Sequence, residues 1–290
     1  MKPFMKINSI KVCAIALLLS ILSINSMAQT LKTPAPSPLQ TIKQNFGISD
    51  ITVEYSRPSL KSRVAFGEVV TFGKIWRTGA NAATKITFSD SVSIEGVPVK
   101  AGTYAVYTIP NAKESWDFIL YNDLTLGGNV ASYKPENEVL HVKVKPTTYG
   151  ERVETFTINF ADVTPTSTTL ELIWEKTRVP VKITTNFDDK IMKNIETVMA
   201  TDSRPYFQAA NYYYENNKDL NQALIWVNKA IEQNPKAFFI VMLKARIELK
   251  LNDKTSAIAD AQKTIALAKD ANNDDYVKMA QALIDSANKK

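Results

Sequence analysis

The chain has 290 residues, a formal net charge of +6, one histidine and one cysteine. A single cysteine excludes an internal disulfide, and a single histidine excludes a metal site built from several histidines. No run of five like charges occurs, so the basic residues are expected to form an ordinary solvated surface and not a nucleic-acid-binding face. The length suffices for about two domains.

The first 28 residues have the pattern of a secretory signal peptide. Three lysines and no acidic residue precede thirteen mostly apolar residues, 12–24, and a small-x-small cleavage site ends at Ala28. Thirteen residues are too few to span a bilayer, which takes about 20. We therefore expect residues 1–28 to be removed, no transmembrane segment to remain, and the protein to be periplasmic or secreted.

Removal of the signal peptide also removes the only thiol. Cys13 lies inside the apolar run, so the mature chain of 262 residues (290 less 28) has no thiol nucleophile and no thiolate metal site. Three lysines leave with no acidic residue, which lowers the net charge from +6 to +3. Residues 29–38 follow with Pro34, Pro36 and Pro38, and are expected to form an extended leader.

Residues 39–186 have the period of β-strands. Apolar and polar residues alternate over short runs, as at Ile51, Val53 and Tyr55, and turn pairs such as Gly127-Gly128 separate these runs. No long helical period occurs here. About ten short strands with tight connections predict an antiparallel β-sandwich with a jelly-roll-like arrangement.

Residues 188–290 have the composition and period of helices. Glycine is absent from residue 151 onward, and the segment 188–200 begins with two acidic residues, which the helix dipole favours. Residues 212–231 align with residues 246–265 at an offset of 34. A last amphipathic helix is predicted over residues 274–290.

The 34-residue recurrence resembles the tetratricopeptide repeat over about residues 204–270. The matching packing positions of the first copy are Phe207, Ala210, Tyr214, Ala223, Ala230 and Pro235. The chain departs from the pattern at Asn211, Thr264 and Lys269. The resemblance implies a small α-solenoid whose groove could hold an envelope protein or peptide, although most of the aromatic residues around positions 206–239 are expected to be core.

The chain has few of the residue types and motifs on which common catalytic mechanisms depend. His141 shares a predicted strand face with Val139, Lys143 and Lys145, which indicates a solvated imidazole, and no Gly-x-Ser-x-Gly elbow accompanies it. Phosphate-binding and dinucleotide-binding glycine loops are absent, so no cofactor is expected.

Carboxylate chemistry remains open, because a glycosidase needs only two acids across a cleft. Glu114, Asp117 and Asp123 could supply such a pair. A calcium site at Asn122, Asp123 and Asn129 is an equally speculative alternative, because the spacing matches no EF-hand loop. No metal site is therefore predicted.

The stretch GKIWRTGANAATKITF, residues 73–88, holds the candidate ligand-binding residues. A turn of small residues separates two strand-like runs, and Trp76, Arg77 and Asn81 could line one edge of a groove, with Arg57 nearby if its strand is adjacent. The alternative is structural: Trp76 is core, Arg77 pairs with a carboxylate, and Asn81 stabilises the turn.

Three stretches in order carry a family resemblance. They are SPLQTIKQNFGISDITVEYSRPSLKSR, FGKIWRTGANAATKITF and PVKAGTYAVYTIP. Over residues 38–184 the chain resembles a family of exported bacterial proteins catalogued as domain of unknown function 2911. That resemblance implies an exported β-rich domain and assigns no activity, ligand or catalytic residue.

These observations predict an exported, noncatalytic binding or assembly module of the bacterial envelope. The alternative is a carboxylate-dependent hydrolase acting on a glycan. A close pair of carboxylates in a cleft would favour the hydrolase, whereas a groove without paired acids would favour the binding module.

Overall fold

The computed structural model describes residues 33–111, 115–200 and 205–289. They form two compact units that divide between Thr185 and Asn186. The predicted signal peptide, residues 1–28, and the first part of the leader lie outside the described residues, while residues 33–38 contain no helix or strand.

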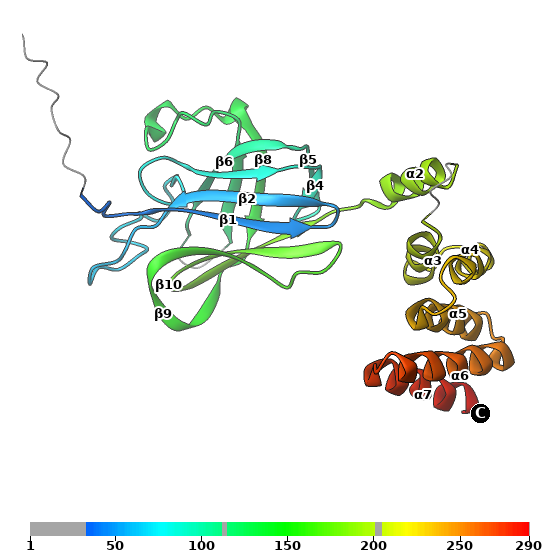
Figure 1. The fold of residues 1–290 in the computed structure, drawn as a ribbon. Coiled ribbons are helices and arrows are strands. Elements are labelled where there is room, and N and C mark those ends of the chain that lie inside the picture. The colour runs from blue at the N-terminus through cyan, green and yellow to red at the C-terminus, as the bar shows by residue number, and fades with distance from the viewer. Residues whose placement is uncertain (1–32, 112–114, 201–204, 290) are drawn as a thin grey trace, which may run out of the picture. The chain divides into compact units, whose positions relative to one another are not determined.

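The first unit consists of two antiparallel sheets packed face to face (Figure 1). The six-stranded sheet has the order β1-β2-β3-β6-β7-β8, and the four-stranded sheet has the order β5-β4-β10-β9. The strands are β1 (Leu39–Phe46), β2 (Ser49–Ser56), β3 (Thr84–Phe88), β4 (Val92–Ile94), β5 (Val97–Val99), β6 (Gly102–Ile109), β7 (Trp116–Tyr121), β8 (Glu138–Val144), β9 (Thr147–Ala161) and β10 (Ser167–Thr184).

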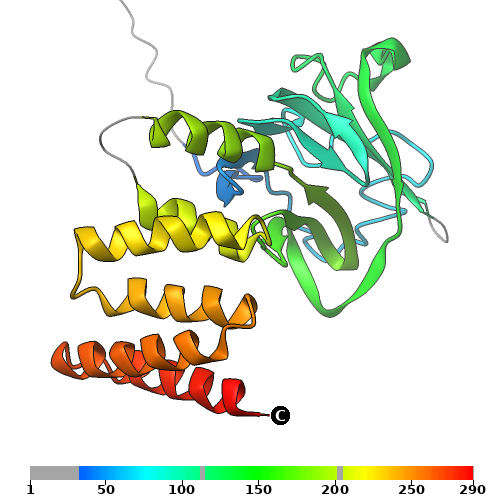
Figure 2. The same ribbon diagram turned by 90° about the vertical axis from the view of Figure 1, so that its right-hand side faces the viewer.

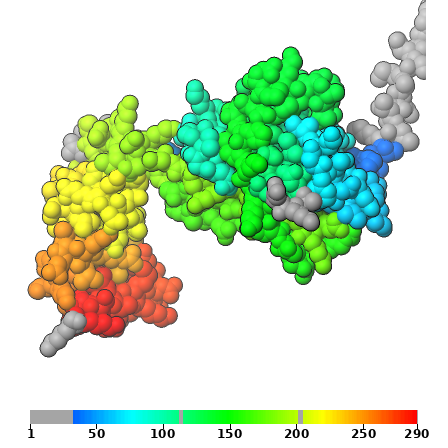
Figure 3. All heavy atoms as spheres, turned by 180° about the vertical axis from the view of Figure 1, so that it is seen from behind, coloured from blue at the N-terminus to red at the C-terminus, as the bar shows by residue number. Residues whose placement is uncertain are grey.

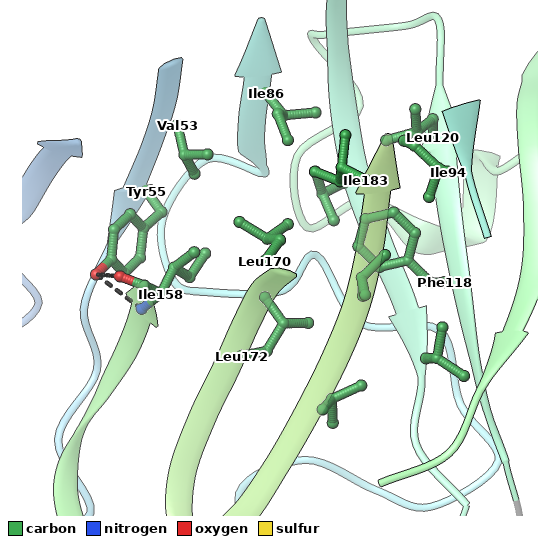
Figure 4. Packing of buried hydrophobic residues seen from close by; sticks show 14 of the residues in the cluster. Val53, Tyr55, Ile86, Ile94, Phe118, Leu120, Ile158, Leu170, Leu172 and Ile183 are labelled. Atoms are coloured by element: carbon green, nitrogen blue, oxygen red, sulfur yellow. Dashed lines mark hydrogen bonds between the residues drawn. The ribbon is translucent and has the colours of Figure 1, made fainter. Parts of the chain in front are cut away.

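The main core fills the space between the two sheets, and both sheets contribute apolar side chains to it (Figure 4). Val53 and Ile86 from the larger sheet meet Leu170 and Leu172 from the smaller one, and each is at most 3% exposed. Burying a side chain of this size stabilises the fold by about 1.5–3 kcal/mol. The hydroxyl of Tyr55 donates to the Ile158 carbonyl at 3.3 Å and accepts from the Ile158 N–H at 2.9 Å, which ties the sheets together.

A second apolar cluster covers the outer face of the six-stranded sheet. Tyr107 of β6 and Ile119 and Tyr121 of β7 are at most 1% exposed there, because the β7–β8 connection folds over them. That connection contains the short 3-10 helices η1 (Val130–Ser132) and η2 (Pro135–Asn137). One part of the outer face is therefore a second buried layer, and this layer positions the candidate site.

The second unit contains six helices in its described residues. They are α2 (Asp188–Met199), α3 (Tyr206–Glu215), α4 (Leu220–Gln233), α5 (Phe238–Lys250), α6 (Lys254–Asp270) and α7 (Asp274–Asn288). Figure 2 shows consecutive helices from α3 to α7 running in alternating directions, and the space-filling view in Figure 3 shows the side chains filling the gaps between their ribbons. The prediction of an antiparallel β domain followed by helices is confirmed.

Two helices of this unit begin at aspartates that lie 34 residues apart. The Asp219 carboxylate accepts from the N–H groups of Asn221 and Gln222, and the Asp253 carboxylate accepts from the N–H of Ser256. Such caps satisfy the free N–H groups of a first helical turn and stabilise a helix by about 1 kcal/mol each. Buried alanines such as Ala223 and Ala257 then allow close packing.

Where α5 meets α6, the buried carboxylate of Glu248 lies beside two partly buried charges. Lys244 Nζ lies 2.9 Å from Asp260 Oδ2 and 3.5 Å from Glu248 Oε1. Glu248 is 4% exposed, and its Oε2 has no hydrogen-bond partner among the described residues. Burial, followed by the charge of Asp260, raises the pKa of Glu248 from 4.5 to about 7.

None of the helices in the described part of the chain has the length and apolar character that crossing a bilayer requires.

Candidate functional site

Trp76 lies in the core between the two sheets. Its ring is 9% exposed, stacks on Trp174 at 5.9 Å and meets Phe156 edge-on at 5.1 Å. Its indole N–H donates to the Gly79 carbonyl at 3.0 Å, so the one polar atom of the ring is satisfied internally. In this structure the Trp76 ring therefore offers no free face to a ligand.

The turn after Trp76 is tightly packed, although its residues are small. Thr78 is fully buried, and its hydroxyl meets the Thr108 hydroxyl at 3.2 Å. A Cβ placed on Gly79 would lie 3.1 Å from the Ser56 carbonyl oxygen, and the φ of Gly79 is +157°. Glycine is thus needed for a close approach of the turn to β2, and the turn leaves no open groove at this point.

Arg57 and Asn81 use their donors inside the β unit. Arg57 donates to the Phe156 carbonyl at 3.0 Å and to the Thr157 hydroxyl at 2.8 Å, which joins the end of β2 to β9. Asn81 has a φ of +59°, a conformation that asparagine tolerates, and its amide donates to the Ser37 carbonyl at 3.2 Å. Both arrangements fit a structural role.

Arg77 leaves the sheet on the side opposite to Trp76 and reaches the outer layer. Its Nε is buried without a hydrogen-bond partner, and its guanidinium makes no hydrogen bond or ion pair with any other described residue. A Cβ placed on Gly128 would lie 2.6 Å from Arg77 Nη1 and 3.3 Å from Cζ. The guanidinium therefore lies directly against the backbone of Gly128, and any side chain at position 128 would displace it.

Three tyrosines lie beside this arginine in the outer layer. Tyr121 and Tyr133 stack at 4.6 Å, and Tyr107 meets each of them edge-on at 5.6 and 5.8 Å. The Tyr107 hydroxyl donates to the Gly127 carbonyl at 2.9 Å. Burial raises the pKa of Tyr107 to about 12, and the positive charge of Arg77 opposes this rise.

A chain of hydrogen bonds continues from the tyrosines to His141. The Tyr133 hydroxyl donates to Glu138 Oε1 at 2.7 Å, and Glu138 Oε2 lies 2.8 Å from His141 Nδ1. His141 Nε2 lies 3.0 Å from Asp117 Oδ1 on β7. The imidazole is thus held between two carboxylates that are only 14% and 19% exposed.

A β-bulge in β8 explains why Glu138 and His141 share a face. Residues three apart point to opposite faces of a regular strand. The pairing of β7 with β8 shifts between Leu120 and Tyr121, so Tyr121 pairs with Glu138 instead of Val139. The sequence prediction that Val139 lies on the His141 face is wrong, because Val139 packs against the main core.

His141 is partly exposed, as predicted, but it is not a freely solvated imidazole. Partial burial on its own lowers the pKa of His141, while the hydrogen bonds to Asp117 and Glu138 outweigh that effect and raise the pKa above 6.5. With both ring nitrogens facing carboxylates, the doubly protonated imidazolium is the favoured form.

The two acidic candidates within the described residues, Asp117 and Asp123, each bind a different neighbour. Glu114 lies outside the described residues. Asp117 binds His141, and Asp123 accepts from the N–H and hydroxyl of Thr125 at 2.8 and 2.7 Å. Within the described ranges no group of three or more His, Cys, Asp or Glu side chains could hold a metal ion, and the Asn129 amide binds Ser132.

Of the four residues predicted to bind a ligand, Arg77 is the one whose buried Nε has no hydrogen-bond partner among the described residues. A guanidinium presents up to five N–H groups in a fixed plane that matches a carboxylate or phosphate. The neighbours of the guanidinium, Gly128 and Tyr107, were not predicted from the sequence. The Gly127-Gly128 pair was predicted only as a turn, and no local pattern indicated that this turn packs on Arg77.

The comparisons with known proteins agree with the sequence resemblance. No curated protein and no solved structure matches this chain. Residues 37–183, slightly more than half of the chain, match the family described as protein of unknown function (DUF2911). This range includes Arg77, the tyrosines and the His141 network. The chain belongs to the DUF2911 family.

Proposed function

We propose that the protein is an exported, noncatalytic binding or assembly module of the bacterial envelope. The signal-peptide pattern of residues 1–28 supports export, and a location in the periplasm or outside the cell follows from it. The arrangement of the outer layer supports binding more than catalysis, since both nitrogens of His141, the only imidazole, are occupied by carboxylates.

One observation carries the binding role: the guanidinium of Arg77 is held in place without an internal partner. A charge-assisted hydrogen bond from such a group is worth about 1.5–3 kcal/mol. Asp123 acts electrostatically on the same Tyr107, but its carboxylate accepts from Thr125 and makes no ion pair with Arg77. A carboxylate or phosphate group of a ligand would accept hydrogen bonds from the unpaired N–H donors of the Arg77 guanidinium.

The test uses a glycine whose side chain would touch the guanidinium. Gly128→Ala should displace the Arg77 guanidinium and weaken ligand capture, and Arg77→Ala should weaken it as well. Gly150→Ala should change nothing, because no atom lies within 4 Å of its Cβ. Gly128 and Gly150 are both exposed and neither has a positive φ, so neither substitution strains the backbone.

Capture is measured with the mature protein as bait in an envelope extract of its host, with mass spectrometry of the bound molecules. A ligand retained by the wild type and by Gly150→Ala, but lost from both Gly128→Ala and Arg77→Ala at unchanged melting temperature, supports the proposal. Equal capture by all four proteins contradicts it.

The helical unit has the features of a surface for an envelope protein or peptide, as the tetratricopeptide-like recurrence suggests. Phe207 of α3 meets Phe239 of α5 at 5.3 Å, and Phe238 of α5 meets Tyr276 of α7 at 4.8 Å. Phe239 remains 37% exposed. Phe239→Ala should therefore weaken capture of a protein partner, whereas Ile225→Ala, which removes a 52% exposed side chain from α4, should not.

The hydrolase alternative requires two carboxylates with space for water or a sugar between them. Asp117 and Glu138, the two acids that flank His141, hold an imidazole in that space. No observation favours hydrolysis.

A further inference from the structure

A cleft of about 540 Å³ opens where the end of β8 faces the two ends of β10. β10 curves strongly, so that Thr185, just after its end, donates to the carbonyl of Thr166, just before its start. The cleft lies beside this curve, and its lining includes Lys143 and Lys145 near the end of β8 and Lys182 of β10. Its volume suits a small molecule.

Three cations of the lining lack partners. No hydrogen bond or ion pair joins the ammonium groups of Lys143, Lys145 or Lys182 to another residue in the part of the chain that the structure describes. Ammonium groups around one cleft repel each other, and an anion placed among them removes that repulsion.

The acidic residues of the lining compensate these charges only in part. Glu95 Oε1 accepts the backbone N–H of Lys182 at 2.5 Å, so this carboxylate is engaged in holding the β4–β5 turn on β10. Asp162, in the turn after β9, is the second acid of the lining. Three cations against two acids leave a net positive cleft.

The walls of the cleft are not uniformly charged. Pro180 is half-buried and exposes part of its ring to the cleft, while the side chain of Val144 is buried behind the lining. Thr168 is buried beside them, and its hydroxyl donates to the Ala161 carbonyl at 3.1 Å. A ligand with a compact carbon skeleton would exclude water from this apolar surface, whereas an inorganic ion would leave the surface hydrated.

We propose that this cleft binds a small organic polyanion, a compact carbon skeleton that carries two or three carboxylate or phosphate groups. Each lysine is exposed, so each contact to the ligand contributes only a few tenths of a kcal/mol to about 1 kcal/mol. Several contacts must act together, which selects multivalent over monovalent anions. The cleft shares no residue with the Arg77 site, and this proposal does not depend on the proposed function.

The test is isothermal titration calorimetry of the full mature chain with citrate and with 2,3-bisphosphoglycerate, at a constant ionic strength of about 0.15 M. Acetate is the monovalent control. Saturable binding of at least one polyanion and none of acetate is expected. The double variant Lys143→Gln/Lys182→Gln should weaken that binding about tenfold, which corresponds to the loss of two exposed charge contacts.

Two control variants distinguish binding in the cleft from binding elsewhere on the protein. Lys74→Gln removes an exposed lysine of the same unit outside the cleft, and Arg77→Ala disables the other candidate site; both should bind the polyanion as the wild type does. Lys145→Gln provides a milder change if the double variant is unstable, and should weaken binding about threefold. The proposal is overturned if neither polyanion binds saturably, or if Lys74→Gln weakens binding as much as the cleft variants.

Discussion

Trp76 and Arg77 are neighbours in the chain, but their side chains lie on opposite faces of the six-stranded sheet. Trp76 pairs with Thr108 through two backbone hydrogen bonds of 2.8 and 2.9 Å, so it behaves as a short strand beside β6. In an extended segment consecutive side chains point to opposite faces. Trp76 therefore enters the main core, while Arg77 reaches the outer layer, where its guanidinium makes no ion pair with a described residue.

His141 allows a direct check of the outer layer by NMR, because it is the only histidine of the chain. Its imidazole signal should titrate with a midpoint above 6.5, since Asp117 and Glu138 favour the protonated form more than partial burial opposes it. A folded-state pKa above the unfolded value stabilises the fold in acid. That contribution is complete below about pH 6.5 and is lost as the pH rises through the folded-state pKa.

The matched variants for this titration are Glu138→Gln and Asp117→Asn. Each keeps the shape of the side chain and removes one negative charge, so each should lower the midpoint of His141. A wild-type midpoint at or below 6.5, or two variants without effect, would show that the hydrogen-bonded network does not form in solution.

The candidate site could be predicted from the sequence only in part. The segment around Arg77 was identified because an arginine next to a turn of small residues is an available donor. Its neighbours come from distant segments: Gly128 lies 51 positions further along the chain, and Glu138 joins His141 only through the bulge in β8. A periodicity argument assumes regular strands, and a single bulge reverses the face of every residue beyond it.

Among the helical elements, α5 and α6 are joined by a contact that costs stability at neutral pH. Glu248 is almost fully buried, and its one cationic neighbour, Lys244, lies closer to Asp260. Removing a carboxylate from water without a complete set of partners favours its protonated form. The packing of α5 on α6 is therefore expected to depend on pH.

Glu248→Gln should stabilise the helical unit above pH 7. The pKa of Glu248 is raised from 4.5 to about 7 in the folded state, so its stabilising contribution is complete below about pH 4.5 and is lost as the pH rises through 7. The shift corresponds to at most about 3 kcal/mol. Melting of the full chain, followed by far-ultraviolet circular dichroism, should show a higher helical transition at pH 8 and little change at pH 5.

Glu232→Gln on α4 is the control, because Glu232 is exposed and its neutralisation should have little effect at either pH. If Glu248→Gln instead lowers the helical transition at pH 8, the ionised carboxylate is well compensated in solution and the assigned pKa direction is wrong.

The elements themselves were more predictable than the site. Alternation identified the strands, because one face of each sheet must be buried against the other sheet. The predicted helix 188–200 corresponds to α2 and the predicted helix 274–290 to α7, each with its end one or two residues earlier in the structure. The second buried layer was not predicted, since Tyr107 and Tyr121 lie on strand faces that any open sandwich would leave to solvent.

At the scale of the whole molecule, the sequence changes from a strand period to a helix period near the place where the chain divides into two compact units. The sequence predicts a division between residues 186 and 188, and the two compact units divide between Thr185 and Asn186. Each unit has its own core, so each can be altered by substitution without emptying the core of the other.

Export can be checked by intact-mass measurement of the protein isolated from its native host. The chain should begin at Gln29, because a basic segment, a short apolar run and a cleavage site at Ala28 direct secretion and removal of the signal peptide. Retention of residues 1–28, or the additional mass of a lipid, would show that the protein is anchored and not released.

The most direct measurement for the proposed binding role follows the captured ligand over time. The mature protein and the Arg77→Ala variant are each incubated with an envelope extract. At successive times, mass spectrometry identifies the molecules in the bound and free fractions and measures their masses. The account predicts a ligand that is retained with unchanged mass by the wild type and is lost from the variant. Progressive conversion of the ligand into products, slowed by Asp117→Asn, would contradict a noncatalytic binding module and indicate an enzyme.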